Sequence, residues 1–195
     1  MSHDTPPRRL IVGMSGASGA IYGIRILQAL QGSGIETHLV MSESARITLA
    51  AESDLTVPEV EALASVVHHV RNVGATVASG SFKTVGMVIA PCSIRTLSEV
   101  AWGGTSSLLT RAADVVLKER HRLVLMLRET PLHAGHLQSM LQVTHNGAIV
   151  MPPVPAFYAR PKTVDDIVNH SVGRVLDLFD IETDLVTRWA GLGKA

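Results

Sequence analysis

The chain has 195 residues and balances 17 lysine and arginine residues against 17 aspartate and glutamate residues, so its formal net charge is zero. That balance argues against a protein that holds nucleic acid or an anionic membrane through an overall positive field. A single cysteine, Cys92, excludes an intramolecular disulfide framework and a zinc or iron–sulfur site built from several cysteines. No apolar run approaches the roughly 20 residues of a membrane span, and the first seven residues lack a hydrophobic leader, so we expect a cytoplasmic protein without a membrane partner.

Short apolar runs alternate along the chain with longer segments of helical spacing. They predict strands at 10–12, 37–41, 66–70, 85–90, 123–127 and 148–151, and helices at 20–30, 44–52, 107–119, 132–143 and from Thr163 onward. Strands that are apolar on both faces and separated by helices are typical of a parallel sheet covered on both sides. We therefore expect one doubly wound α/β domain over 1–195, Rossmann-like and of flavodoxin type, with loose tails at 1–8 and 189–195.

Every predicted strand that could border a ligand is followed by small, hydroxyl or charged residues. Open α/β sheets bind their ligands at the carboxyl ends of the strands. The segments that follow these strands are 13–19, Ser42, 91–93, 128–129 and 152–153 with 157–158 beyond. Their convergence at one edge of the sheet predicts a ligand site there.

The glycine-rich turn after the first strand is the strongest local signal. Gly13, Gly16 and Gly19 lie between a strand and a helix start, where backbone N–H groups and the helix dipole favour an anion. The spacing G-x-x-G-x-x-G differs from the dinucleotide motif, and Ser42 stands where an NAD-binding protein usually has an acid. A phosphate-bearing ligand is favoured over a purely structural turn, and a mononucleotide such as FMN fits better than NAD.

Other chemical interpretations of single motifs are weaker. Residues 16–20 resemble the nucleophile elbow of serine hydrolases, but that elbow comes late in a hydrolase sheet and not after its first strand. Cys92 has no activating neighbour in the sequence, so we interpret it as a packing residue and Ser93 as the ligand contact. Arg128 could pair with a phosphate and Glu129 could move protons, the alternative being a solvated loop pair.

Two patterns that suggest metal binding have simpler explanations. Asp165 and Asp166 resemble the acidic metal motif of terpenoid synthases, but they follow Thr163 at a helix start, where carboxylates complement the helix dipole. The histidine pairs 68–69 and 133/136 lack further ligands at metal spacing. We expect no metal.

Several motifs together carry a family likeness. They occur in the order 13–20, 78–81, 91–93, 111–120, 128–131 and 155–158. The chain resembles the UbiX-type flavin prenyltransferases, formerly called aromatic acid decarboxylase small subunits, from about Arg9 to Trp189. The resemblance implies transfer of a dimethylallyl group from dimethylallyl monophosphate to N5 and then C6 of reduced FMN. The product, prenylated FMN, would serve a UbiD-type decarboxylase, and the enzyme would be a homo-oligomer, typically a dodecamer, with sites at subunit contacts.

The resemblance also implies roles for individual residues. The FMN contacts would be Gly16, Ala17, Ser18, Ser42, Ser93, Ile94, Arg95, Thr96 and Arg128. The donor phosphate would be held by Tyr158 and Arg174, with Lys118 and Arg111 as further neighbours. Glu129 would transfer a proton, and Ser18 is a second catalytic candidate. Fixed cationic and hydroxyl donors can stabilise a phosphate leaving group without magnesium, and an apolar pocket can shield an allylic cation from water.

Two positions depart from the pattern of that family. Val73 stands where many members have a tryptophan in the wall of the prenyl pocket, which leaves the selectivity for the prenyl tail open. Arg95 stands where many members have lysine, and the positive charge is kept. Two other functions remain as alternatives: an FMN-binding carrier or assembly subunit, and a flavin-dependent decarboxylase that acts directly.

Overall fold

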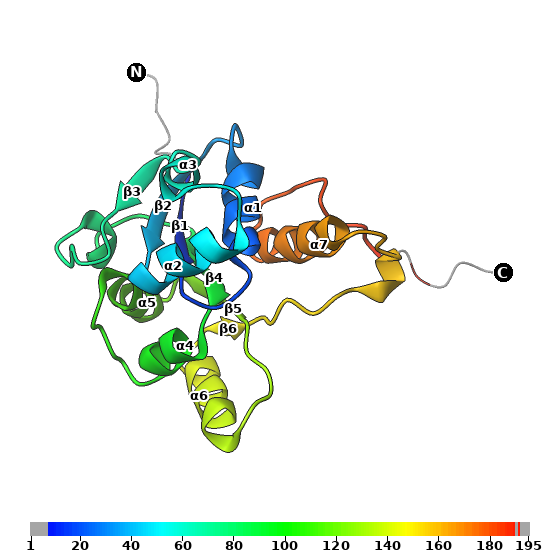
Figure 1. Ribbon diagram of the computed structural model, residues 1–195. Helices are drawn as coiled ribbons and strands as arrows, with labels where there is room; N and C mark the ends of the chain where they lie inside the picture. Colours follow the sequence, from blue (N-terminus) through cyan, green and yellow to red (C-terminus); the bar gives the residue numbers. More distant parts are fainter. Residues whose placement is uncertain (1–7, 190, 192–195) are drawn as a thin grey trace.

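The computed structural model describes residues 8–189 and Gly191, and it contains one six-stranded sheet (Figure 1). The strand order is β3-β2-β1-β4-β5-β6, and every neighbouring pair is parallel. The strands are β1 (Arg8–Met14), β2 (Ile35–Met41), β3 (Val66–His68), β4 (Gly86–Cys92), β5 (Arg122–Leu127) and β6 (Ile149–Val150). This confirms the doubly wound parallel sheet. Its strand order is the 3-2-1-4-5-6 order of a Rossmann sheet, in which the order of adding strands reverses between β1 and β4.

The helices lie close to their predicted positions, with two additions. They are α1 (Ala20–Leu30), α2 (Glu43–Glu52), α3 (Val57–Glu61), α4 (Ile94–Ala101), α5 (Leu108–Lys118), α6 (Ala134–His145) and α7 (Val164–Asp177), with short 3-10 turns η1 (Thr76–Ala78) and η2 (Phe157–Ala159). The sequence analysis missed α3 and α4. Both had readable start signals, a capping box of Thr56 with Glu59 and the N-cap Ser93, but each helix is too short for its apolar period to stand out.

The structure describes only a few residues of the two predicted tails. Residues 1–7, 190 and 192–195 lie outside the described part of the chain. Arg8, which was expected in the N-terminal tail, is instead the first residue of β1 and pairs with Ile35 of β2. Its guanidinium donates to the carbonyl of Phe179 at 3.0 Å, so the strand is held at this end as well as along its length. Within residues 8–189 no helix is both long and apolar enough to cross a bilayer.

The strands send alternate side chains into two separate cores, one on each face of the sheet. Leu10 and Val12 of β1 pack into the core under α1, α2, α3 and α7, whereas Ile11 packs into the core under η1, α4, α5 and α6. Figure 1 shows α1 and α7 on one side of the sheet and α4, α5 and α6 on the other. This cover on both faces is the reason that most strand positions are apolar.

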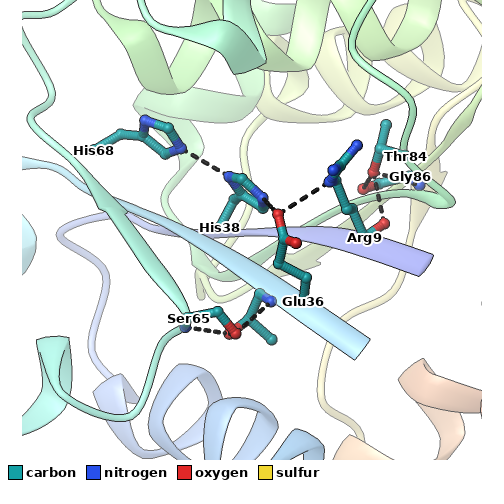
Figure 2. Close-up of polar contacts among 8 residues, drawn as sticks. Arg9, Glu36, His38, Ser65, His68, Thr84 and Gly86 are labelled. Atoms are coloured by element: carbon teal, nitrogen blue, oxygen red, sulfur yellow. Dashed lines mark hydrogen bonds and ion pairs between the residues drawn. The ribbon is translucent and has the colours of Figure 1, made fainter. Parts of the chain in front are cut away.

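A polar cluster interrupts the second core beside β2 (Figure 2). Nδ1 of the buried His38 lies 2.9 Å from Nε2 of His68, and its Nε2 lies 2.7 Å from Oε1 of Glu36. Arg9 donates to the same Glu36 oxygen at 3.0 Å. The hydrogen bond from His38 is the main cause that lowers the pKa of Glu36, and burial, followed by the nearness of His38, lowers the pKa of His68. Here the expectation of an apolar strand is wrong, and the polar groups are tolerated because each has a partner.

Gly86 at the start of β4 lies where no side chain would fit. Its φ is +142°, and a Cβ there would lie 2.2 Å from the carbonyl oxygen of Arg122 and 2.8 Å from the ring of Phe179. The close approach lets β4 pair with β5 while Phe179 closes the end of the first core. A larger residue at this position must therefore push β5 away from β4.

We expect Gly86→Ala to lower the free energy of unfolding by about 2–4 kcal/mol, because it adds a steric clash to a positive φ. Gly32→Ala is the matched control, since Gly32 has φ +71° but nothing within 4 Å of the added Cβ. The control should cost only about 1 kcal/mol in urea unfolding followed by circular dichroism. Equal losses in the two variants would contradict the close approach at Gly86.

Candidate functional site

The carboxyl ends of β1 and β4 are tied together by one buried hydroxyl. Oγ of Ser15 donates to the carbonyl of Pro91 at 2.8 Å and accepts from the backbone N–H of Ser93 at 2.7 Å. The backbone N–H of Ser15 donates to the same Pro91 carbonyl at 3.1 Å. The backbone N–H of Ser42 donates to the carbonyl of Met14, and the backbone N–H of Arg128 donates to the carbonyl of Cys92, each at 3.0 Å. The predicted convergence is therefore confirmed for the segments after β1, β2, β4 and β5, and hydrogen bonds hold it.

The glycine-rich turn binds an anion, but that anion belongs to the protein. Oε2 of Glu52, from the end of α2, accepts hydrogen bonds from the N–H groups of Gly19 at 2.7 Å and Ala20 at 3.3 Å. The N-terminus of α1 is thus already neutralised by a carboxylate, whereas the sequence analysis assigned it to a ligand phosphate. Glu52 itself was missed. The available signal was an acidic residue in the last turn of a helix, where it opposes the helix dipole.

The charge of Arg128 also acts on Glu52. Burial by itself would raise the pKa of Glu52, but hydrogen bonds from Ser18, Gly19 and Ala20 and the charge of Arg128 together lower it. Arg128 acts on Tyr22 too: burial raises the pKa of that phenol, and the guanidinium partly offsets the rise. The structure therefore brings Ser18 and Arg128, two of the predicted FMN contacts, to the same end of α1.

Gly16 allows α2 to pack directly on the turn. A Cβ at Gly16 would lie 2.5 Å from both Cβ and Oγ of Ser44. Oγ1 of Thr48 donates to the Gly16 carbonyl at 3.2 Å, one helical turn further along α2. The glycine at this position is therefore explained by the close packing of Ser44 of α2 against the turn.

A hollow of about 550 Å³ opens beside these strand ends, a size within the usual range for small-molecule sites. Four predicted FMN contacts line it, namely Ser42, Ser93, Arg95 and Thr96. Its apolar lining comes from Ile47, Val70, Val73 and Leu109. Val73 is 56% exposed, so its small side chain leaves room in the wall.

Two helix N-termini border this hollow, because Ser42 is the N-cap of α2 and Ser93 the N-cap of α4. Oγ of Ser42 accepts from the N–H of Ala45 at 3.0 Å, and Oγ of Ser93 accepts from the N–H of Thr96 at 3.2 Å. Helix N-termini carry partial positive charge and bind phosphate groups. These residues, together with Arg95, fit the phosphate of a mononucleotide better than the N-terminus of α1 does.

Glu99 builds the far wall of the hollow and was not predicted. Its Oε1 accepts from the N–H of Ser106 at 2.9 Å and from Oγ1 of Thr110 at 2.9 Å, which fixes the loop between α4 and α5. Burial would raise the pKa of Glu99, but the hydrogen bonds from Ser106 and Thr110 and the charge of Arg95 lower it. Glu99 therefore stays ionised and lies near Arg95.

Glu129, the predicted proton-transfer group, follows β5 and is partly buried. Its Oε1 accepts from the N–H of Thr130 at 3.1 Å. The neighbouring Arg128 is exposed at the same strand end. The pair thus lies at the edge where the strand ends converge.

Tyr158 and Arg174 both lie away from the hollow. Oη of Tyr158 in η2 lies 3.0 Å from Nε2 of His170 on α7, and Arg174 donates to Asp177 at 2.6 Å. Figure 1 shows the chain after β6 crossing to the outer end of α7, on the opposite side of the sheet from α5. Arg174 borders a separate hollow of about 330 Å³.

Arg111 and Lys118, which the resemblance places near the donor phosphate, do not lie with Arg174 within one protomer. Arg111 pairs with Asp114 at 2.8 Å, and Lys118 pairs with Glu119, so each is paired on or next to α5. The elements that carry these cations cover opposite faces of the sheet. One copy of the chain therefore cannot bring them to a common phosphate.

Two structural roles predicted from the sequence are confirmed. Cys92 is fully buried, and burial raises the pKa of its thiol, as expected for a packing residue. Oδ2 of Asp166 accepts from the N–H groups of Lys162 at 2.8 Å and Thr163 at 2.9 Å, which completes a capping box at the start of α7.

His133 is the N-cap of α6, and its ring lies against that of His136 with centroids 3.6 Å apart. Among the described residues no three acidic, histidine or cysteine side chains gather as a metal site.

Comparison with known proteins places this chain in a family. A family model described as Flavoprotein matches residues 1–176. The flavin prenyltransferase UbiX of Thauera aromatica is 63% identical over 183 residues, which are 94% of each chain. The crystal structure of AnUbiX (PadA1) in complex with FMN and dimethylallyl pyrophosphate is 49% identical, covers 95% of this chain and 99% of its own, and overlays with a TM-score of 0.94. A dodecameric FMN-dependent UbiX-like decarboxylase from Escherichia coli O157:H7 is also 49% identical, covering 94% of this chain and 100% of its own, with a TM-score of 0.91.

These matches cover 94–95% of the chain. The chain therefore belongs to the UbiX flavin prenyltransferase family of flavoproteins.

Proposed function

We propose that this chain transfers a dimethylallyl group from a dimethylallyl phosphate to N5 and then C6 of reduced FMN. The observation that carries the proposal is the near-complete overlay, at a TM-score of 0.94, on a relative that binds both FMN and dimethylallyl pyrophosphate. The name of the Thauera relative supports the same reaction. Reduced FMN is the acceptor substrate, and the leaving phosphate and one proton complete the balance of atoms.

The flavin phosphate occupies the hollow at the N-termini of α2 and α4. Ser42, Ser93, Arg95 and Thr96 line that hollow, and the two helix ends supply the partial positive charge that a phosphate requires. The remaining contacts come from the loops that Ser15 and Glu52 hold in place. These contacts are Gly16, Ala17, Ser18, Ile94 and Arg128.

The donor phosphate is held by Tyr158 and Arg174, with Lys118 and Arg111 supplied by neighbouring copies. The support for a shared site is that these residues lie apart within one protomer, while a relative of 49% identity is dodecameric. Exposed apolar side chains suit such an assembly: Trp102 is 67% exposed, Leu141 58% and Phe157 76%. We propose a homo-oligomer, in which subunit contact completes the site.

The chemistry follows from these placements. The bond between the allylic carbon and the phosphate oxygen breaks, and fixed guanidinium, ammonium and phenol donors stabilise the charge that develops on the phosphate. N5 of the flavin supplies the electron pair for the first bond to the prenyl group. N5 loses its hydrogen as a proton when that bond forms. A proton added to the remaining prenyl double bond makes its tertiary carbon electrophilic, and C6 forms the second bond to that carbon. C6 then releases its own proton, which Glu129 or the departed phosphate accepts, so that one proton is released overall. The apolar wall around Val73 keeps water from the allylic cation.

The reaction is tested by anaerobic incubation of the protein with reduced FMN and either dimethylallyl monophosphate or dimethylallyl pyrophosphate. The flavin should gain the mass of one C5H8 unit with at least one of the two donors. An unchanged flavin mass under verified reducing conditions would overturn the proposal, and bound but unreactive FMN would favour a carrier. Two structural relatives are named decarboxylases, so carbon dioxide release from an aromatic acid by this chain alone would favour direct decarboxylation.

The product, prenylated FMN, passes to a UbiD-type decarboxylase. The support is the chemistry of the product, a modified flavin that another enzyme must use. The transfer is measured by mixing the charged protein with such a decarboxylase lacking its cofactor and following decarboxylation. Activity that does not depend on this chain would contradict the transfer.

Glu129→Gln should slow prenyl transfer by about 10²-fold while FMN binding changes less than about twofold, because the amide cannot accept the proton from C6. Flavin titration by fluorescence and product formation by mass spectrometry separate the two effects. Complete loss of flavin binding would assign Glu129 a structural role.

Arg174→Ala should raise the KM for the dimethylallyl donor by about tenfold or more and leave FMN affinity nearly unchanged, because it removes one charge-assisted hydrogen bond to the donor phosphate. Arg46→Ala, which removes an ion pair with Glu61 on the outer part of α2 and α3, is the control for a lost arginine. Equal losses of donor and FMN affinity in the Arg174 variant would contradict this division of roles.

Glu52→Gln should lower the free energy of unfolding at neutral pH by about 0.5 kcal/mol, a value reduced by the solvent exposure of the carboxylate. The pKa of Glu52 is lowered in the folded state, so its stabilisation is present above the ordinary glutamate pKa of about 4.3 and disappears as the pH falls through the folded value. Urea unfolding at several pH values should show the two proteins converging in acid. A difference that persists below that range would rule out the carboxylate charge as its cause.

A further inference from the structure

The aromatic ring of Tyr158 makes edge contacts with two other rings beside α7. The imidazole of His170 lies on one side, with ring centroids 5.6 Å apart and an interplanar angle of 81°. The indole of Trp189 also lies 5.6 Å away, at 74°. The ring is therefore held by edge contacts, while the side chain remains 47% exposed.

One polar contact sets the direction of the phenol hydroxyl. Oη of Tyr158 lies 3.0 Å from Nε2 of His170, and the imidazole tautomer decides which atom donates. A phosphate oxygen can only accept, and the phenol has a single hydrogen. If Tyr158 donates that hydrogen to a phosphate, its contact with His170 must be one in which Nε2–H donates to the phenol oxygen.

We propose that His170 is a positioning residue for prenyl transfer: its Nε2–H donates to the phenol oxygen of Tyr158 and directs the phenol hydrogen toward the donor phosphate. The inference rests on the proposed function, in which Tyr158 binds that phosphate. Arg174 is one helical turn beyond His170 on α7, so the same helix sets the positions of both donors. The hydrogen bond from His170 polarises the phenol and so strengthens the hydrogen bond that the phenol donates to the phosphate.

Two substitutions separate the hydrogen bond from the ring contact. His170→Phe keeps an aromatic ring against Tyr158 but has no N–H, whereas His170→Gln loses the ring and places an amide N–H near the position of Nε2. Kinetics are measured with reduced FMN and dimethylallyl monophosphate for both variants, for Tyr158→Phe, and for the double variant Tyr158→Phe with His170→Phe. His145→Phe, at an exposed histidine in the last turn of α6, is the matched control.

We expect Tyr158→Phe to raise the KM for the donor by about tenfold and His170→Phe by about fivefold, each with the KM for FMN unchanged. His170→Gln should stay within about twofold of the unsubstituted protein. The double variant should be no worse than Tyr158→Phe alone, because His170 acts only through the hydroxyl. His145→Phe should leave both KM values unchanged.

The outcomes distinguish this inference from the function on which it rests. An unsubstituted protein that makes no prenylated flavin overturns the proposed function. An active protein in which Tyr158→Phe has no effect removes Tyr158 from the donor site. If Tyr158→Phe is impaired but His170→Phe is not, or if the two losses multiply in the double variant, His170 does not position the hydroxyl and the inference is overturned.

Discussion

The buried hydroxyl of Ser15 is the contact on which the geometry of the site depends. It donates to the Pro91 carbonyl and accepts from the Ser93 N–H, so the loop after β1 and the start of α4 cannot move independently. Ser15 is 2% exposed, and in so dry a position the loss of either partner would leave an unsatisfied polar group. The N-cap of α4, and with it one positive wall of the hollow, is therefore held in register with the glycine-rich turn.

The second constraint is the neutralisation of α1 by Glu52. The N–H groups of Gly19 and Ala20 would otherwise attract any available anion, and the carboxylate from α2 satisfies both. This leaves the N-termini of α2 and α4 for a ligand phosphate, on the side of the hollow lined by Ser42 and Ser93. The Glu52 carboxylate thus occupies one of the three helix N-termini at this edge of the sheet.

The helices and strands could be located from the sequence because their signals are local. All of the predicted strands and helices lie within two residues of those in the structure, since apolar periodicity and flanking glycines mark them directly. Helix α4 was not predicted because its eight residues hold only two turns. The polar cluster was not predicted because His38 meets His68, and Arg9 meets Glu36, only after three strands align. Glu52 and Glu99 were missed for the same reason: their partners are distant in sequence or across a loop.

The sequence by itself determined the doubly wound sheet and the family resemblance, and it predicted one edge of the sheet and residue types suited to phosphate, because periodicity and motif spacing are properties of the chain. Only the tertiary structure decided which of those residues meet. It placed Ser18 with Glu52 and Arg128, placed Ser42 with Ser93 and Arg95, and separated Tyr158 and Arg174 from Arg111 and Lys118. The physical reason is that α5 and α7 cover opposite faces of the sheet, so sequence order carries no information on how far apart their charges lie.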